Sequence, residues 1–155
     1  MKLLILSDSH GNVRSIRRIL EKEAPFDYLI HCGDGVRDLL HAEIPAGSRV
    51  LKVAGNVDLS VVYDMDRVIT EEICGLHFLI THGDLYDAHN GYGMLMSEGR
   101  NTDSDVVLFG HTHIQYCSEG TPVLFNPGTA MKGFYGVIHC EAGEDPVFTH
   151  GKIQS

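Results

Sequence analysis

Residues 2–12 read KLLILSDSHGN, an unbroken apolar run that ends at an acidic residue, an imidazole and a glycine. Continuous apolar runs of this length are typical of strands that are buried on both faces, whereas a half-buried strand alternates. An amphipathic helix is predicted next, because Asn12 is a natural N-cap, the apolar residues after it share one face, and Pro25 bounds the segment. A second apolar run, Tyr28–Cys32, follows. Strand, helix and strand of these lengths predict a parallel pair joined by a right-handed crossover.

Five apolar runs in the chain end in the same way, in a polar segment that contains glycine. They are Lys2–Ser7 before Asp8-Ser9-His10-Gly11-Asn12, Tyr28–Cys32 before Gly33-Asp34-Gly35, Val50–Val53 before Ala54-Gly55-Asn56, Leu76–Thr81 before His82-Gly83-Asp84, and Val106–Phe109 before Gly110-His111-Thr112-His113. Buried strands of an α/β sheet present their carboxyl ends to the ligand crevice. We therefore expect seven side chains to gather in one region: Asp8, His10, Asp34, Asn56, His82, His111 and His113.

The rest of the chain is predicted to complete one α/β domain over residues 1–155. The predicted elements are a short helix over Val36–Ala42, a hairpin of Val68–Ile73 and Leu76–Ile80 around Gly75, a long loop with one weak helix over Asp84–Thr102, and strands at Val123–Asn126, Phe134–Cys140 and Val147–Ile153. The sequence shows no internal repeat, low-complexity tract or linker, which favours a single domain.

The composition is that of a packed globular protein, with 43% hydrophobic and 21% charged residues. The four cysteines form no C-x-x-C pair, which argues against a zinc ribbon or a redox motif, and so few cysteines suit a reducing compartment. A domain of this size needs no disulfide. The apolar start is too short for a signal peptide, and no run approaches the ~18 apolar residues of a membrane span. We therefore expect a cytoplasmic protein without membrane contact.

Two Asp, four His and one Asn are a suitable ligand set for two divalent ions of intermediate softness, such as Mn²⁺, Fe²⁺, Ni²⁺ or Zn²⁺. Four imidazoles argue against Mg²⁺ and Ca²⁺, which prefer oxygen ligands. Two such ions, roughly 3.5–4 Å apart, clamp an attacking and a leaving oxygen and lower the pKa of bound water. A site of this kind needs no protein nucleophile.

The chain also resembles the calcineurin-like metallophosphoesterases, and among them the small single-domain phosphodiesterases. The family's blocks occur in its order: Asp8-Ser9-His10-Gly11, Gly33-Asp34, Gly55-Asn56-Val57-Asp58, Thr81-His82-Gly83 and Gly110-His111-Thr112-His113. The resemblance implies a four-layer α-β-β-α sandwich of two mixed sheets flanked by helices. It also implies an enzyme that uses a hydroxide bridging two divalent metals, Mn first and Fe, Ni or Zn as alternatives, for direct in-line attack on a small phosphate ester.

By the same resemblance, each ligand has a role. Asp8, His10 and His113 hold one metal, Asn56, His82 and His111 hold the other, and Asp34 bridges them. Two alternatives stay open, a phosphomonoesterase on the same site and a non-catalytic protein-binding scaffold of the same fold. The resemblance further suggests a homodimer or higher homo-oligomer. The net charge of −9 argues against extended nucleic-acid binding and leaves bound metal as the source of positive charge for a phosphate ester.

Val57 departs from a common pattern of the superfamily, in which a His after the Asn protonates the leaving oxygen. Valine has no proton to give, so Asp58, Asp84 and His89 are the candidate substitutes. The turn Asn126-Pro127-Gly128-Thr129 also resembles a family element near the site and receives no chemical role. The histidines outside the metal set are interpreted as structural, His89 excepted.

Overall fold

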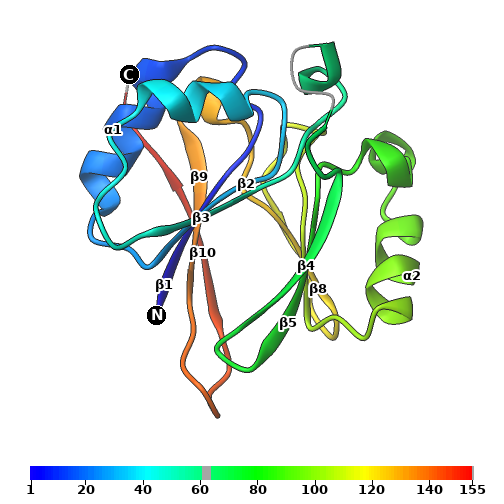
Figure 1. Cartoon of the computed structure of the whole chain (residues 1–155). Coiled ribbons are helices and arrows are strands. Elements are labelled where there is room, and N and C mark those ends of the chain that lie inside the picture. The colour runs from blue at the N-terminus through cyan, green and yellow to red at the C-terminus, as the bar shows by residue number, and fades with distance from the viewer. Residues whose placement is uncertain (61–63, 155) are drawn as a thin grey trace.

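The computed structural model describes residues 1–60 and 64–154, which form two five-stranded mixed sheets packed face to face (Figure 1). The first sheet has the order β10-β9-β1-β2-β3, with β1 at Lys2–Leu6, β2 at Tyr28–His31, β3 at Arg49–Lys52, β9 at Phe134–His139 and β10 at Val147–Lys152. In it β1, β2 and β3 are parallel, and β9 is antiparallel to both of its neighbours.

The second sheet has the order β4-β5-β6-β8-β7. Its strands are β4 at Val68–Ile73, β5 at Leu76–Thr81, β6 at Val106–Leu108, β7 at Tyr116–Cys117 and β8 at Val123–Asn126. Here β5, β6 and β8 are parallel, while β4 and β7 are antiparallel edge strands. The predicted hairpin is confirmed as β4 and β5, which pair in register from Ile73 and Leu76 outward.

Helices cover the outer face of each sheet, so the predicted four-layer sandwich is confirmed (Figure 1). The first sheet carries α1 at Val13–Glu23, with the 3-10 turns η1 at Val36–His41 and η5 at Ala130–Lys132. The second sheet carries α2 at Gly93–Asn101. Three more 3-10 turns, η2 at Asp58–Ser60, η3 at Asp84–Tyr86 and η4 at Ala88–Asn90, lie in the loops. Among the described residues, no helix combines the length and the apolar character that crossing a bilayer requires.

The cap and the apolar face that predicted the helix α1 are both present in the structure. Asn12 caps it, since the side-chain oxygen accepts the Ser15 N–H at 3.1 Å. Ile16, Ile19 and Leu20 are its buried face against the first sheet. The helix ends at Glu23, just before the predicted boundary at Pro25.

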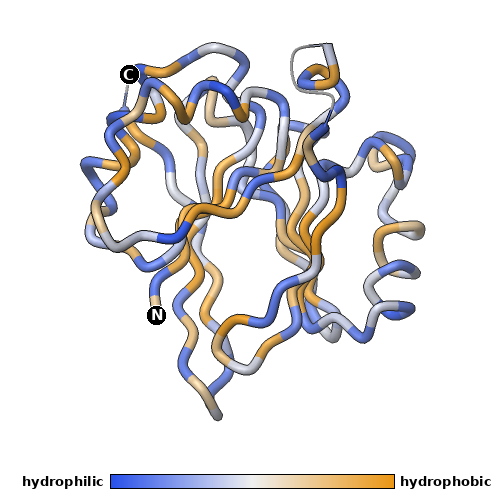
Figure 2. Tube along the Cα trace, viewed as in Figure 1, coloured by the Kyte–Doolittle hydropathy of each residue, from blue (hydrophilic) through white to orange (hydrophobic). Residues whose placement is uncertain are grey.

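Three apolar clusters separate the layers. One lies between the two sheets and combines side chains such as Ile5 and Ile30 with Phe78 and Leu108. The other two lie between the first sheet and α1 and between the second sheet and α2. Figure 2 shows the apolar residues following the strands through the middle of the molecule, with alternating polarity along α1.

Three predictions differ from the structure. The run Val50–Val53 is not a strand buried on both faces: β3 is an edge strand whose Val50 is 36% exposed. The predicted helix over Val36–Ala42 is a 3-10 turn. The segment Asp84–Thr102 holds two 3-10 turns and a nine-residue helix, more structure than its Gly, Asp and Asn content indicated.

Candidate metal centre

The candidate ligands come from both sheets and meet at one end of the sandwich. Asp8 and Asp34 follow β1 and β2 in the first sheet, whereas His82 and His111 follow β5 and β6 in the second. These residues, with His10 and His113, form two groups whose ligand atoms lie within 4.8 Å of one another in each group. The gathering that the strand ends predicted is therefore observed for six of the seven residues.

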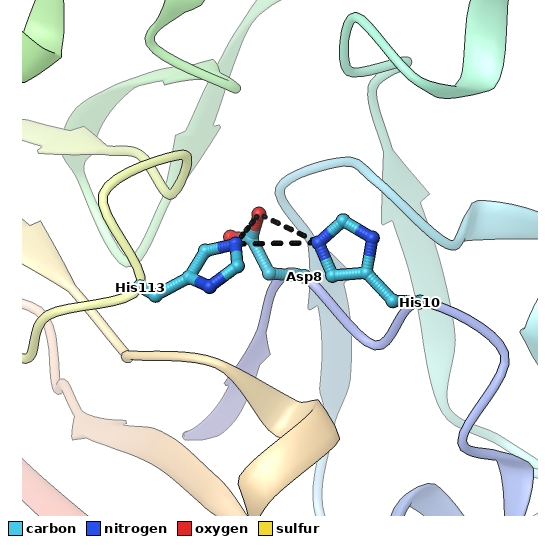
Figure 3. Close-up of side chains that lie close together, drawn as sticks. All are labelled: Asp8, His10 and His113. Atoms are coloured by element: carbon cyan, nitrogen blue, oxygen red, sulfur yellow. Dashed lines mark hydrogen bonds and ion pairs between the residues drawn. The ribbon is translucent and has the colours of Figure 1, made fainter.

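The first group is Asp8, His10 and His113, whose side chains point toward one another, Asp8 and His10 from the loop after β1 and His113 from the loop after β6 (Figure 3). Oδ1 of Asp8 lies 3.2 Å from Nε2 of His113 and 3.6 Å from Nε2 of His10. The two Nε2 atoms are 3.2 Å apart. Asp8 Oδ1 is buried, yet it has no hydrogen-bond partner within the described part of the chain. A buried carboxylate oxygen without a partner is costly, and a bound cation would satisfy it.

The second group is Asp34, His82 and His111. Nε2 of His82 lies 3.1 Å from Oδ2 of Asp34 and 3.2 Å from Nδ1 of His111. On its other side, the His82 ring places Nδ1 2.8 Å from the Cys32 carbonyl oxygen, to which it donates a proton. Because Nδ1 makes this hydrogen bond, loss of the proton on Nε2 that faces Asp34 would leave a lone pair directed at the group, as ligating histidines require.

The charges of the second group are strongly coupled. Although burial lowers the pKa of His82, its hydrogen bond to Asp34 and the nearby charge of Asp8 raise it above the usual value. Burial raises the pKa of Asp34, but the hydrogen bond and charge of His82 outweigh this and lower it. The two buried carboxylates thus favour positive charge at this place, which a divalent ion would supply.

The two groups adjoin. Oδ2 of Asp34 lies 4.0 Å from Nε2 of His10 in the first group, and Oδ1 of Asp8 lies 3.8 Å from Nε2 of His82 in the second. Asp34 therefore lies within reach of both groups, the position that a bridging carboxylate needs.

Asn56, the seventh predicted ligand, is exposed and belongs to neither group of imidazole and carboxylate ligands. It precedes Val57, whose N–H donates to Oδ1 of Asp34 at 2.9 Å. Its loop thus touches the centre, and its role as a ligand stays a prediction.

The backbone is strained at the ligands. Asp8, His10, Asp34, His111 and His113 all have positive φ, between 42° and 69°. This region is unfavourable for residues with a Cβ, and such residues cluster at sites whose geometry the surrounding structure enforces.

Asp58 is one residue that enforces this geometry. It is 3% exposed, and its Oδ2 accepts the N–H groups of Asp34 at 2.7 Å and Gly55 at 2.8 Å. Its Oδ1 accepts those of Gly35 at 2.9 Å and Val36 at 3.3 Å. All four contacts use Asp58 as an acceptor and tie the Asp34 loop to the Asn56 loop. These hydrogen bonds indicate that Asp58 positions the two loops, whereas its place in the sequence had suggested a proton donor.

The turn that begins at Asn126 supports the other ligands. The Asn126 amide donates to the Gly110 carbonyl at 3.1 Å and to the Thr112 hydroxyl at 3.0 Å, which fixes the loop of His111 and His113. The Thr129 hydroxyl donates to the Asp8 carbonyl at 2.7 Å. Ser7 adds a hydrogen bond of 2.6 Å to Oδ2 of Asp8. Sequence reasoning gave these residues no role, although the position of Ser7 beside a ligand was a usable signal.

The two loop residues considered as proton donors have different surroundings. The ring of His89 is exposed and lies against that of His111, with centroids 4.1 Å apart. Asp84 forms an ion pair with Arg67, whose Nε donates to the Ala54 carbonyl at 3.3 Å. Asp84 is therefore an ion-paired residue beside the centre.

His31 is structural, as predicted. It is fully buried, and its Nδ1 accepts the Gly33 N–H at 3.1 Å while Nε2 lies 3.0 Å from the Ser9 hydroxyl. Burial lowers the pKa of His31 to about 4. The neutral ring thus supports the loops of both Asp8 and Asp34.

The calcineurin-like phosphoesterase superfamily domain matches residues 1–141 of the chain. The chain belongs to this superfamily. Within it, the chain is 32% identical over 135 residues to the probable metallophosphoesterase YsnB of Bacillus subtilis, covering 83% of this chain and 75% of YsnB. It is 30% identical over 153 residues to the phosphodiesterase MJ0936 of Methanocaldococcus jannaschii, covering 88% of this chain and 89% of that protein.

The fold is shared more widely than the sequence. The structure of wild-type Vps29 from Entamoeba histolytica complexed with Zn²⁺ superposes with a TM-score of 0.73 at 15% identity, over 98% of this chain and 99% of that one. At this identity the likeness concerns the fold alone. The superfamily assignment itself rests on residues 1–141.

Proposed function

We propose that this protein is a metal-dependent phosphodiesterase that acts on small phosphodiesters by direct in-line attack of a hydroxide bridging two divalent ions. Asp8, His10 and His113 would hold one ion, Asn56, His82 and His111 the other, and Asp34 would bridge them. Such ions supply Lewis acidity and a nucleophile at neutral pH. Mn²⁺ suits this mixed nitrogen and oxygen set, with Fe²⁺, Ni²⁺ and Zn²⁺ as the alternatives.

The observation that carries the proposal is the pair of adjoining ligand groups around Oδ1 of Asp8, a buried oxygen that has no hydrogen-bond partner among residues 1–60 and 64–154. Three imidazole nitrogens, of His10, His82 and His113, lie between 3.2 and 3.8 Å from this buried oxygen. Structural histidines are normally paired with donors or acceptors away from one another, whereas these converge.

The neighbouring hydroxyls are engaged in supporting the loops, which agrees with the absence of a protein nucleophile. Ser7 and Ser9 are both fully buried. Ser7 donates to Asp8, and Ser9 donates to Asp38 at 2.7 Å. The hydroxyl of Ser9 also faces His31, but the carboxylate of Asp38 contacts the serine and not the histidine. In a serine-hydrolase triad the carboxylate instead contacts the histidine, which in turn contacts the serine.

The charges around the centre favour a diester over a monoester. A phosphodiester carries one negative charge at neutral pH, and a phosphomonoester carries nearly two. Arg67, the arginine beside the Asn56 and His82 loops, is already neutralised by Asp84. Val57, which is 52% exposed next to Asp34, adds an apolar surface for the second ester group.

The rival reading is a scaffold of the same fold. The presence of all seven candidate ligands in the sequence favours catalysis, because binding to a protein partner needs neither the buried carboxylates nor the strained loops that carry them. The strain costs on the order of 1–3 kcal/mol per residue, which a scaffold has no reason to keep.

The test is turnover of bis(4-nitrophenyl) phosphate and 4-nitrophenyl phosphate by protein stripped with a chelator and reloaded with Mn²⁺. We expect activity only after reloading, a larger kcat/KM for the diester, and inversion at phosphorus with a chiral substrate. Retention of configuration contradicts direct attack. A larger kcat/KM for the monoester supports the phosphomonoesterase, and no turnover by fully loaded protein supports the scaffold.

A further inference from the structure

Two thiols from different sheets touch at the end of the sandwich away from the candidate metal centre. Cys74 lies in the turn between β4 and β5, and Cys140 directly follows β9. They are 66 residues apart in the sequence, yet the Cys140 thiol contacts Sγ of Cys74 at 2.7 Å. The Cys74 thiol in turn lies 3.2 Å from the Cys140 carbonyl oxygen, to which it donates.

The backbones on both sides of this contact are firmly held. Cys74 and Gly75 are the two central residues of the hairpin turn, and both have the positive φ that a tight two-residue turn requires. Cys140 exchanges hydrogen bonds with Met1, since its N–H donates to the Met1 carbonyl at 3.0 Å and its carbonyl accepts from the Met1 ammonium at 2.8 Å. The two thiols are thus presented to each other by paired strands and not by loose loops.

The contact lies opposite the ligand cluster. The strand β5 runs from the residue after Gly75 to the residue before His82, and β1 runs from the Met1 end toward Asp8. A six-residue strand spans roughly 20 Å. The ligand cluster draws side chains from both sheets at one end of the sandwich, and the two thiols join the same two sheets at the other end.

We propose that Cys74 and Cys140 are an oxidation site, which closes into an intramolecular disulfide when the protein meets a small disulfide such as oxidised glutathione. Cys74 is half-buried and reacts first: its sulfur attacks the oxidant, forms a mixed disulfide and releases one glutathione thiol. Cys140 then attacks the Cys74 sulfur and releases the second. The two electrons of the protein dithiol pass to the oxidant's S–S bond, and both protons end on glutathione.

The order of attack follows from the surroundings of the two thiols. Cys140 is 2% exposed, and burial raises its pKa to about 12, so it seldom forms a thiolate by itself. Because Cys140 is held against Cys74, even its small thiolate fraction meets the mixed disulfide directly, and the proton that it loses ends on the departing glutathione. Cys32 is fully buried, and the structure describes no second thiol beside the exposed Cys117. Cys117 therefore has no thiol within reach for an intramolecular disulfide in the folded protein.

The experiment uses the full chain with Cys117→Ser, which leaves three of its four cysteines. The reduced protein is incubated with oxidised glutathione, alkylated in denaturant and analysed by intact mass and by non-reducing peptide mapping. We expect one alkyl group on the oxidised chain and three on the reduced control, an intact mass before alkylation that is lower by two hydrogen atoms, and linked Cys74 and Cys140 peptides. The urea midpoint of the oxidised protein should exceed that of the reduced protein, and dithiothreitol should abolish the difference.

Two further variants separate the steps. Adding Cys140→Ser should leave one stable glutathione adduct on Cys74, whereas adding Cys74→Ser should leave Cys140 unmodified. A stable adduct on Cys74 in the presence of Cys140, a disulfide-linked dimer, or three unreacted thiols in folded protein each overturns the proposal. None of these readouts depends on metal or on turnover, so the proposal stands or falls separately from the proposed function.

Discussion

Replacing Asp58 by Asn tests whether this residue positions the metal loops or donates a proton. The change keeps the shape of the side chain and removes one acceptor oxygen. Each carboxylate oxygen now accepts two backbone N–H groups, those of Asp34 and Gly55 on one side and of Gly35 and Val36 on the other. Whichever way the amide turns, its NH₂ group faces two N–H donors.

The expected loss of stability follows from these contacts. Two hydrogen bonds to a charged acceptor disappear, each worth about 1.5 kcal/mol at the lower end, so Asp58→Asn should destabilise the fold by about 3 kcal/mol. With an m-value of about 2 kcal/mol per M in urea, the unfolding midpoint should fall by about 1.5 M. Because the loops of Asp34 and Asn56 lose their link, metal affinity should fall by roughly 10–100-fold.

The assay compares urea unfolding, metal titration and turnover of aryl diesters with graded leaving groups. At saturating metal, Asp58→Asn should keep the dependence of rate on leaving-group pKa that the parent shows. Asp105→Asn is the matched control, since Asp105 accepts the single N–H of His77 at 2.8 Å at an exposed position. In Asp105→Asn the amide oxygen can still accept the His77 N–H, so the free energy of unfolding should change by less than about 0.5 kcal/mol. An unchanged midpoint in Asp58→Asn, with loss of only the poor leaving groups, would refute the positioning role and restore the proton donor.

Two other predictions concern the ligands and the missing proton donor. Asp34→Ala should lose more activity than His113→Ala, because Asp34 lies within reach of both ligand groups and His113 belongs to one. Metal analysis checks this, and two ions still bound in Asp34→Ala would contradict a bridge. In the parent, Val57 cannot protonate the leaving oxygen, so aryl diesters should react well, alkyl diesters poorly, and the rate should depend steeply on leaving-group pKa. Val57→His should rescue the poor leaving groups by up to about 10²–10⁴-fold, as general-acid assistance typically does. A flat dependence in the parent, with chemistry rate-limiting, would mean that another residue supplies the proton.

The sequence was sufficient for most of the strands and for most of the candidate centre, because both follow from local patterns, whereas the four-layer sandwich was implied only by the family resemblance. The continuous apolar runs predicted β1, β2, β5 and β6, and the polar residue after each run marked where the ligands gather. This inference about where the ligands gather does not depend on knowing the distances between side chains of different sheets. Strands whose carboxyl ends lie at the same end of a sheet bring together the residues that follow them.

What the sequence could not predict depends on contacts between distant segments. Nothing local distinguishes the edge strand β3 from a buried strand, since its neighbour is decided by the order of the whole sheet. The ion pair of Asp84 with Arg67 was not predicted, because the two residues lie 17 positions apart in the sequence. The contact of Cys74 with Cys140 was missed for the same reason, because spacing rules for cysteine pairs apply to neighbours in sequence.

The strain at the ligands explains why so many buried polar residues surround them. Five ligands hold left-handed backbones, a conformation that a free loop would leave. The residues that prevent this are acceptors and donors just outside the ligand set: Asp58 fixes the Asp34 loop, Thr129 fixes the backbone of Asp8, and Asn126 fixes the His111 loop. A Cβ at Gly55 would lie 2.7 Å from the backbone nitrogen of Asp34. The close approach of the two loops therefore requires glycine at this position. The ligand positions are thus held by hydrogen bonds from the surrounding loops, which favours a constant distance between the two groups.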